Sequence, residues 1–282
     1  MVKLSGVSET LLVPLCARYL ETQKPDGLIR DPFASEIVER LGCDCERLAG
    51  MRSVQLGIAI RAEILDRETR RFLQSHPDAA VVSLGAGLDT RFYRVDDGRV
   101  FWAELDLEEV RRVWDELFEE TERHRFLTYS AFDFRWMDEV RELAGGRALL
   151  FIAEGLLMYF EEREVRELVV RLRREFPGSE MLLETMGPLL ARHTRQHPAI
   201  SKTKAKFKWG IGGVREMEAW AEGIRCLGEW EMLNQHRRRW GWMGLLSLIP
   251  QLRRQLKVGH LRLGPAGGGA AGSPPAGDAE HV

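Results

Sequence analysis

The sequence predicts an α/β protein built around a largely parallel sheet, because short apolar runs alternate along the chain with amphipathic helical segments. Three runs are apolar almost throughout, as strands buried on both faces are, and each ends in a glycine: 79–85, 147–155 and 179–187. In segments 107–120 and 161–176, apolar residues recur at spacings of three and four, which predicts helices. Strands alternating with helices indicate a parallel α/β sheet.

The regions on either side of these strands have a different character. Residues 8–75 contain helical patterns and no strand-like run, so we expect an all-helical region ahead of the sheet. Behind the third strand, 227–235 and 258–263 are expected to be late strands that bracket a helix. The tail from Gly264 onward is dense in glycine, alanine and proline, and we expect it to be disordered.

Length and charge favour a small-molecule partner. The chain has 282 residues, enough for one large α/β domain or for one domain with a subdomain. Its 41 Lys and Arg residues nearly balance 43 Asp and Glu residues, so the overall charge favours neither nucleic acid nor an anionic membrane as a partner. No stretch approaches the roughly 18 uninterrupted apolar residues of a membrane helix.

The four cysteines give no sign of a metal site. Cys43 and Cys45 form a close pair, but the chain has no second pair at a zinc-ribbon spacing and no histidine-rich segment after them. We therefore expect Cys16, Cys43, Cys45 and Cys226 to be reduced thiols of a cytoplasmic protein without a bound metal.

The stretch SLGAGLDT, residues 83–90, is typical of a turn that holds a nucleotide-type cofactor. Glycine lets the backbone bend tightly and approach a ligand, and Gly85 and Gly87 directly follow the first predicted strand. A dinucleotide fingerprint requires a third small residue where this chain has the β-branched Thr90. This departure disfavours a nicotinamide-dependent oxidoreductase, which stays open as an alternative.

Acidic residues follow the strand-like segments at positions that suit an adenosyl cofactor. Asp106 lies about 20 residues beyond the glycines, where a carboxylate can accept hydrogen bonds from both ribose hydroxyls. Asp133 and Phe134 combine an acceptor for an exocyclic amine with an apolar contact for an adenine ring. Alternatively, Asp106 and Asp133 are acids at helix starts. Glu154 ends an apolar run, where a buried carboxylate requires a cationic ligand group or an arginine nearby.

The motifs GAGLDTRFYR, ELDLEEV, SAFDF and FIAEGLLMYFEE, in this order, resemble the leucine carboxyl methyltransferase family, and most closely its bacterial branch. The resemblance extends from about residue 8 to residue 263. It implies a class I S-adenosylmethionine-dependent methyltransferase fold, a Rossmann-like seven-stranded sheet with one antiparallel strand and an N-terminal helical lid. On this basis we expect a lid over 1–75, a methyltransferase domain over 76–263 with a substrate-side insertion at about 186–215, and a tail over 264–282.

The resemblance also implies the cofactor, S-adenosyl-L-methionine, and the residues that contact it. Arg61 matches an arginine that pairs with the methionyl carboxylate, although the residues alone make it one of several arginines in a helix. Glu154 matches a glutamate close to the methionyl ammonium. Where many relatives carry proline, Glu108 is an acceptable first-turn helix residue. The expected cofactor contacts are Arg61, Gly85, Ala86, Gly87, Asp106, Leu107, Asp133, Phe134 and Glu154.

Methyl transfer from a sulfonium depends on alignment more than on a strong base, and the sequence indicates no unique catalytic residue. The expected acceptor is a small molecule, polyketide-like in the bacterial branch, methylated at a carboxylate or a hydroxyl. His193 and His197 are base candidates that a surface helix explains equally well. A basic stretch could attract an acidic substrate or carrier protein, but we prefer a solvated loop; its lysines are Lys202, Lys204, Lys206 and Lys208. A non-catalytic cofactor-binding protein is a further alternative.

Overall fold

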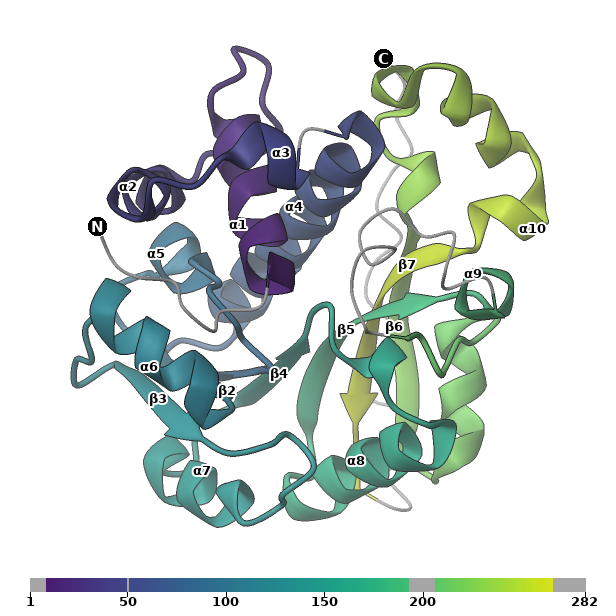
Figure 1. Cartoon of the computed structure of the whole chain (residues 1–282). Helices are drawn as coiled ribbons and strands as arrows, with labels where there is room; N and C mark the ends of the chain where they lie inside the picture. The colour runs from purple at the N-terminus through teal and green to yellow at the C-terminus, as the bar shows by residue number, and fades with distance from the viewer. Residues whose placement is uncertain (1–8, 50, 193–205, 266–282) are drawn as a thin grey trace.

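The sheet has seven strands in the order β3-β2-β1-β4-β5-β7-β6 (Figure 1). The structure, a computed structural model, describes residues 9–49, 51–192 and 206–265. Strand β7 runs antiparallel to both its neighbours, β5 and β6, and the other neighbouring strands are parallel. The predicted α/β class and single antiparallel strand are therefore confirmed. The strands are β1 (Ala80–Leu84), β2 (Phe101–Asp106), β3 (His124–Thr128), β4 (Leu149–Ala153), β5 (Ser179–Met186), β6 (Ile224–Glu231) and β7 (Leu256–Leu263).

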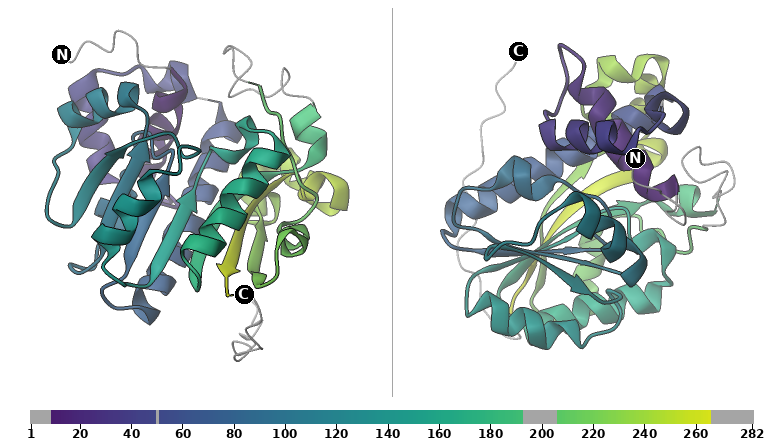
Figure 2. Two further views of the ribbon diagram at one scale, coloured as in Figure 1. Left: turned by 90° about the horizontal axis from the view of Figure 1, so that it is seen from below. Right: turned by 60° about the vertical axis from the view of Figure 1, so that its left-hand side comes forward.

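Helices cover both faces of the sheet, as Figure 2 shows, and this explains why the parallel strands are apolar throughout. On one face α4 (Arg52–Ser75) and α5 (Arg91–Val95) pack against β1, β2 and β4. On the other face α7 (Trp136–Ala144) and α8 (Glu162–Glu175) bury an apolar stripe against the same strands. All residues of β1 and β4 are buried, so the predicted strand pattern is confirmed.

The described part of the chain ahead of the sheet is entirely helical, as predicted. Three helices, α1 (Glu9–Thr22), α2 (Pro32–Leu41) and α3 (Cys45–Ala49), form an apolar cluster with α6 (Glu108–Leu117). Helix α4 packs against both this cluster and the sheet, because Ile58 lies in the cluster whereas Ile60 packs against the sheet. The N-terminal helices are thereby fixed over the carboxyl ends of β1 and β2 (Figure 1).

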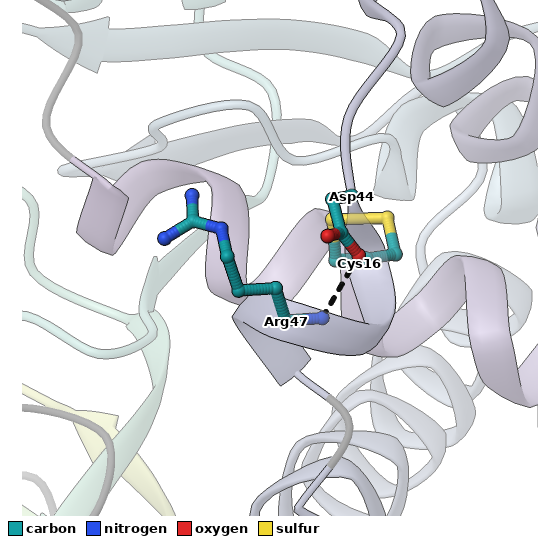
Figure 3. The surroundings of a disulfide bond; sticks show 4 residues. Cys16, Asp44 and Arg47 are labelled. Atoms are coloured by element: carbon teal, nitrogen blue, oxygen red, sulfur yellow. Dashed lines mark hydrogen bonds between the residues drawn. A yellow bond between two sulfur atoms is a disulfide. The ribbon is translucent and has the colours of Figure 1, made fainter.

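The expectation of reduced cysteines is wrong for two of the four. Cys16 on α1 and Cys45 on α3 form a disulfide with their Cα atoms 4.9 Å apart (Figure 3). The Asp44 carboxylate accepts a hydrogen bond from the Arg47 backbone N–H, which begins α3 beside the bond. The pairing depends on how α1 and α3 pack and not on any local spacing. Cys43 and Cys226 are free.

The C-terminal part departs most from the predicted pattern. The two late strands are confirmed, but the segment between them consists mainly of 3-10 helix, η4 (Met232–Asn234) and η5 (Arg237–Leu248), followed by the short α10 (Pro250–Arg253). Gly241 lies at φ 59°, which interrupts the helical path, and the Cα of Gly244 lies so close to the Arg237 carbonyl that a Cβ there would approach it to 2.5 Å. Glycines disfavour a continuous α-helix at these positions.

Candidate functional site

A cavity of about 640 Å³ opens where the strand order of the sheet reverses, between β1 and β4. In open α/β sheets, ligands bind in the crevice outside the carboxyl ends of the strands at this reversal. The walls come from α1, α4, the turn after β1, the ends of β4 and β5, and the C-terminal segment of η4, η5 and α10. Its volume is in the range typical of small-molecule sites.

The glycine turn after β1 forms one wall of the cavity, with Gly85, Ala86 and Gly87 all lining it. Gly85 and Gly87 have φ values of 63° and 59°, a region that glycine adopts without strain. A Cβ on Gly85 would lie 2.7 Å from Leu156, and a Cβ on Gly87 would lie 3.2 Å from Leu11. The turn therefore needs glycine both for its conformation and for the space around it.

Asp106, at the end of β2, holds this turn in place. Its carboxylate accepts hydrogen bonds from the backbone N–H groups of Gly87 at 2.8 Å and Leu107 at 2.7 Å. Burial raises the pKa of the Asp106 carboxyl, and the described residues bring no cation to offset it. A carboxylate has about four lone-pair sites, so it can still accept hydrogen bonds from a ligand. Leu107 is 49% exposed and sits beside it as the N-cap of α6.

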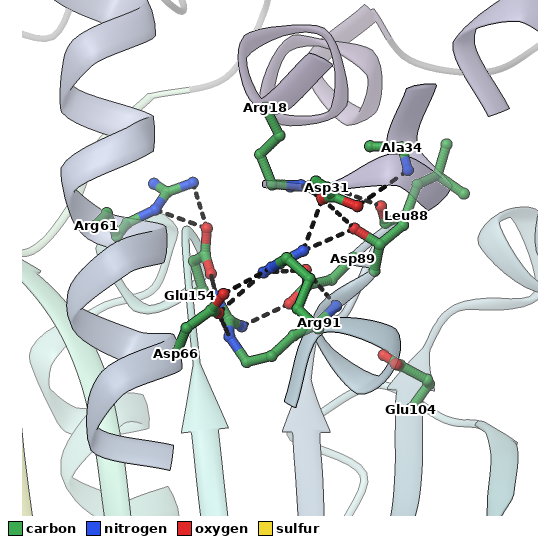
Figure 4. Close-up of polar contacts among 12 residues, drawn as sticks. Arg18, Asp31, Ala34, Arg61, Asp66, Leu88, Asp89, Arg91, Glu104 and Glu154 are labelled. Atoms are coloured by element: carbon green, nitrogen blue, oxygen red, sulfur yellow. Dashed lines mark hydrogen bonds and ion pairs between the residues drawn. The ribbon is translucent and has the colours of Figure 1, made fainter. Parts of the chain in front are cut away.

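Arg61 on α4 lies between two carboxylates, Glu154 and Glu184, and Figure 4 shows its pairing with Glu154. Its Nε donates to Glu154 at 2.7 Å and its Nη1 donates to Glu184 at 2.7 Å. The Glu184 carboxylate also accepts from the Gly155 N–H at 2.8 Å. The arginine that Glu154 was expected to need is therefore present. Glu184 was missed in the sequence, although it lies near the end of the third predicted strand, two residues before β5 ends at Met186.

Arg91 and Arg94 extend this cluster into the protein, and Figure 4 shows Arg91 beside Asp66, Asp89 and Glu154. Arg91 is fully buried and donates to Glu154 at 2.6 Å and to Asp66 at 2.8 Å. Arg94 pairs with Asp66 and with Asp31, which Arg18 of α1 also contacts. Although burial alone would raise it, the pKa of the Glu154 carboxyl is held well below its ordinary value by Arg61 and Arg91. Each of these charged groups thus has at least one buried partner of opposite charge.

We call the charged lining of the cavity the polar end: Arg18, Arg61, Asp89, Glu154 and Glu184. These are all the charged side chains that line the cavity within the described residues. Arg18 further anchors α1 to the turn, because its Nη2 donates to the Leu88 carbonyl at 2.8 Å. Helix α1 and the glycine turn are therefore linked directly.

Most of the remaining lining is apolar, and much of it comes from the C-terminal segment. We call this part the apolar arm, and define it by Met186, Met232, Trp240, Met243, Leu246 and Leu252. The Trp240 indole N–H donates to the Gln235 carbonyl at 3.1 Å, so that its polar atom is satisfied outside the arm. The sequence had not indicated these residues as a cavity wall. Met232, Trp240, Met243 and Leu246 fall in 3-10 helix without an α-helical period, whereas Met186 ends β5 and Leu252 lies in α10.

Tyr159, which follows β4 in η1 (Leu157–Tyr159), also lines the cavity. Burial and then the nearby Glu184 carboxylate raise the pKa of the Tyr159 phenol. The phenol is therefore protonated at neutral pH and can donate a hydrogen bond. Its ring contacts Phe207, with centroids 5.4 Å apart.

Asp133 and Phe134 do not line the cavity in this structure. The Asp133 carboxylate accepts hydrogen bonds from the Arg135 guanidinium, at 2.8 Å for Nε, and this pairing lowers the pKa of Asp133. The Phe134 ring lies under the Arg171 guanidinium, 4.2 Å from its centroid. The structure therefore brings Arg61, Glu154 and the glycine turn together, and holds these two residues apart from them.

Some predicted features lie outside the described residues. This applies to His193, His197, Lys202 and Lys204 and to the tail from residue 266. Lys206 and Lys208 are exposed, and Trp209 between the basic stretch and β6 is buried at 3% exposure. Within the described residues, no group of three or more His, Cys, Asp or Glu side chains is arranged to hold a metal ion, and no helix has the length and hydropathy to span a membrane.

The arrangement fits an adenosyl cofactor with a charged amino-acid group. The glycine turn forms a cradle that a Cβ would fill, and Asp106 stands beside it with free acceptor capacity. The polar end offers both guanidinium and carboxylate groups to a ligand that carries both signs of charge.

Comparisons with known proteins agree with this geometry. Residues 12–173 match the family model for leucine carboxyl methyltransferase. The chain is 32% identical over 260 residues to the tetracenomycin polyketide synthesis O-methyltransferase TcmP of Streptomyces glaucescens, covering 89% of this chain and 95% of that protein. It is 26% identical over 266 residues to the S-adenosyl-L-methionine-dependent methyltransferase dpfgK of Gibberella zeae, covering 86% and 88%.

Among solved structures, a duf574 family protein from Streptomyces avermitilis superposes with a TM-score of 0.57 at 13% identity, over 88% of this chain and 97% of the other. At that identity the match supports the fold alone. The family model, which spans β1 to β4 and the polar-end residues up to Glu154, and the relative matched over 89% of this chain support more. The chain therefore belongs to the leucine carboxyl methyltransferase family and is an S-adenosylmethionine-dependent methyltransferase.

Proposed function

We propose that the protein transfers a methyl group from S-adenosylmethionine to an oxygen atom, a carboxylate or a hydroxyl, of a small polyketide-like acceptor. The observation that carries the proposal is a single cavity in which a glycine turn and a charged cluster adjoin an apolar arm. The curated relative named for polyketide synthesis, which the chain matches over nearly its whole length, supports the acceptor class. When bound, the cofactor supplies an activated methyl group on a sulfonium.

In this proposal the polar end and the turn bind and orient the cofactor. Asp106 accepts hydrogen bonds from the ribose, with Leu107 beside it, and Gly85, Ala86 and Gly87 face the methionine moiety. Arg61 and Glu154 bind its carboxylate and ammonium groups. Asp133 and Phe134 are proposed adenine contacts from the family resemblance, and this role requires the Asp133 carboxylate to exchange its pairing with Arg135 for the adenine amine.

The charge balance of the buried cluster supports a cationic ligand. The arginines Arg18, Arg61, Arg91 and Arg94 face one more carboxylate than their own number, namely Asp31, Asp66, Asp89, Glu154 and Glu184. A buried excess of negative charge is costly unless a cation joins it. An ammonium or sulfonium group at the polar end would supply that cation.

The chain's own part in the reaction is alignment and exclusion of water. Positioning of two reactants in a near-attack geometry can contribute about 7 to 11 kcal/mol to a displacement. The apolar arm excludes water around the acceptor, and α1 closes the cavity over the glycine turn. Tyr159 lines the cavity, and its protonated hydroxyl is the group we propose to donate a hydrogen bond to the acceptor oxygen.

The same proposal divides the chain into working parts. The lid, residues 1–75, contributes Leu11 and Arg18 to the cavity, and the insertion at about 186–215 contributes Leu189 and Phe207. Residues 76–263 form the methyltransferase domain. We propose a cytoplasmic location and a small-molecule acceptor as the partner; a reduced Cys16–Cys45 pair in freshly isolated protein would support that location, since disulfides are rare in the cytosol.

Calorimetry with S-adenosylmethionine, S-adenosylhomocysteine and NAD tests the cofactor part. We expect both adenosyl compounds to bind and NAD not to bind. Binding of NAD without binding of S-adenosylmethionine would contradict the proposal. A methyl-release assay over a panel of carboxylates and phenols then tests turnover. Inactivity with every member of a broad panel, despite cofactor binding, would indicate a non-catalytic binding protein.

A further inference from the structure

Many residues line the cavity besides the proposed cofactor contacts. Asp106 and the proposed adenine contacts do not line it, so the groups proposed to bind the adenosine part lie outside this cavity. The arm residues Met232, Trp240, Met243, Leu246 and Leu252 all lie after residue 173, where the match to the family model ends. The apolar arm can therefore hold a second molecule. Most of its wall residues belong to the C-terminal segment, beyond the part of the chain that the family model matches.

The 3-10 helix η5 separates the arm from solvent. After Gly241, residues three apart share one face of this helix because a 3-10 helix has three residues per turn. Met243 and Leu246 line the cavity on one face. On another face Trp242, Leu245 and Leu248 are exposed by 74%, 66% and 66%. Neighbouring residues of one short helix thus have opposite environments.

All the charges of the described lining are gathered at the polar end, and each charged group there already has an oppositely charged partner or a backbone partner. The few polar groups near the arm are also engaged: the Gln255 side chain accepts from the Leu190 N–H at 3.1 Å and donates to the Gln251 carbonyl at 2.6 Å. A charge carried on a ligand inside the arm would have no charged partner among the described lining residues, and burial of an unpaired charge is costly.

We propose that the apolar arm binds the body of the methyl acceptor and selects molecules whose body is uncharged, with their nucleophilic oxygen at the polar end. The inference rests on the proposed function and adds to it the class of acceptor and the residues that select it. Met243 and Leu246 of η5 are the specificity-determining side chains. An ionised group distant from the methylated oxygen excludes an acceptor.

The probes are 2-naphthol and 6-hydroxynaphthalene-2-sulfonate, which share the ring and the hydroxyl but differ by a charge at the far end. Calorimetry is performed on the full chain saturated with S-adenosylhomocysteine. We expect the sulfonate to bind at least about tenfold more weakly than the naphthol. Equal affinity of the two probes, or no naphthol binding up to about 1 mM with cofactor binding intact, overturns the inference.

A matched pair of variants tests whether the cavity-lining face of η5 contacts the probe. Met243→Asp should weaken naphthol binding by about tenfold or more, because it places a charge in the arm, whereas Leu245→Asp on the exposed face should leave it unchanged. Met243→Lys should reverse the preference towards the sulfonate, and this gain of binding cannot come from misfolding. Equal losses in Met243→Asp and Leu245→Asp, or no reversal in a Met243→Lys variant that still binds S-adenosylhomocysteine, overturn the inference.

These measurements separate the two proposals. Probe binding requires no turnover, and the affinity for S-adenosylhomocysteine is recorded for every variant. If the cofactor product does not bind to the wild-type chain, the proposed function fails. If S-adenosylhomocysteine binds but the chain does not prefer the uncharged probe, the proposed function stands and the inference about the arm is wrong.

Discussion

The two ends of the cavity are built from opposite kinds of interaction. At the polar end, Arg61 and Glu154 belong to a buried chain of ion pairs with distances of 2.5 to 3.0 Å, which fixes each group in one position. In the apolar arm, Met243 and Leu246 meet the cavity from a 3-10 helix and make no polar contact that fixes them. The polar end suits a ligand that all members of a family share, such as the cofactor. The apolar arm suits a ligand that varies between members, such as the methyl acceptor.

This difference has a physical basis. Ion pairs are directional, and loss of one member leaves a buried charge, so such a cluster tolerates little change. Apolar contacts are non-directional, and methionine in particular adapts its shape to the molecule beside it. We therefore expect substitutions at the polar end to affect folding and cofactor binding, and those in the arm to affect mainly the choice of acceptor.

The largest effect is expected from Arg91→Met, which removes a fully buried cation from Asp66, Asp89 and Glu154. The free energy of unfolding in urea should fall by about 3–5 kcal/mol, whereas Met243→Leu in the arm should cost less than about 1.5 kcal/mol. Similar losses of unfolding free energy in the two variants would show that the polar end and the arm do not differ in their contribution to stability.

The pH dependence of the same experiment has a defined sign. The pKa of Glu154 is lowered in the folded protein, so its ionised form contributes stability above the ordinary carboxyl pKa. That contribution is lost as the pH falls through the lowered, folded-state pKa. The deficit of Arg91→Met relative to the wild type should therefore shrink in acid, and a deficit that grows in acid would contradict this origin.

The next largest effect is expected from Asp106→Asn. Its carboxylate can accept hydrogen bonds from a ribose, and loss of bonds to a charged acceptor costs about 1.5–3 kcal/mol, or roughly 10- to 100-fold in the calorimetric Kd for S-adenosylhomocysteine. Asp133→Asn is the comparison, since that carboxylate is already paired with Arg135 whereas Asp106 has no cation beside it among the described residues. We expect a smaller loss there, and a loss equal to that of Asp106→Asn would mean that ligand binding rearranges the Asp133–Arg135 pair.

A smaller effect is expected from Tyr159→Phe. Loss of its proposed hydrogen bond to the acceptor oxygen should lower kcat about tenfold and leave the affinity for S-adenosylmethionine unchanged. Because burial and Glu184 raise the pKa of Tyr159, wild-type activity should not fall at a pH near 10, where a free phenol ionises. A change in cofactor affinity as large as the change in kcat would place Tyr159 in the cofactor site instead.

The same contrast explains what could be predicted from the sequence. Strands buried on both faces are apolar throughout, so β1, β4 and β5 could be located, and the glycine turn with Asp106 follows from their spacing. Glu184 carried the same signal as Glu154, a carboxylate at a strand end, and could have been found. The pairing of Cys16 with Cys45 depends on packing between helices that no local pattern reveals.

The apolar arm could not be found in this way. Met243 and Leu246 lie in a stretch in which Trp242 and Leu245 are equally apolar, so composition does not separate the residues that line the cavity from those that face solvent. Their separation depends on the three-residue turn of η5 and on the interruption at Gly241. Only the folded backbone contains that information.

The smallest effect is expected from Leu246→Ala, which enlarges the arm without adding charge. Removal of part of one apolar wall should shift the ratio of kcat/KM between a bulkier and a smaller acceptor by about threefold to tenfold in favour of the bulkier, since small changes in an apolar pocket discriminate weakly. Leu245→Ala, on the exposed face, should leave the ratio as it is. Cofactor affinity should stay unchanged in both variants, because the ion-paired end does not depend on the arm; a loss of cofactor binding in Leu246→Ala would show that the two ends are coupled.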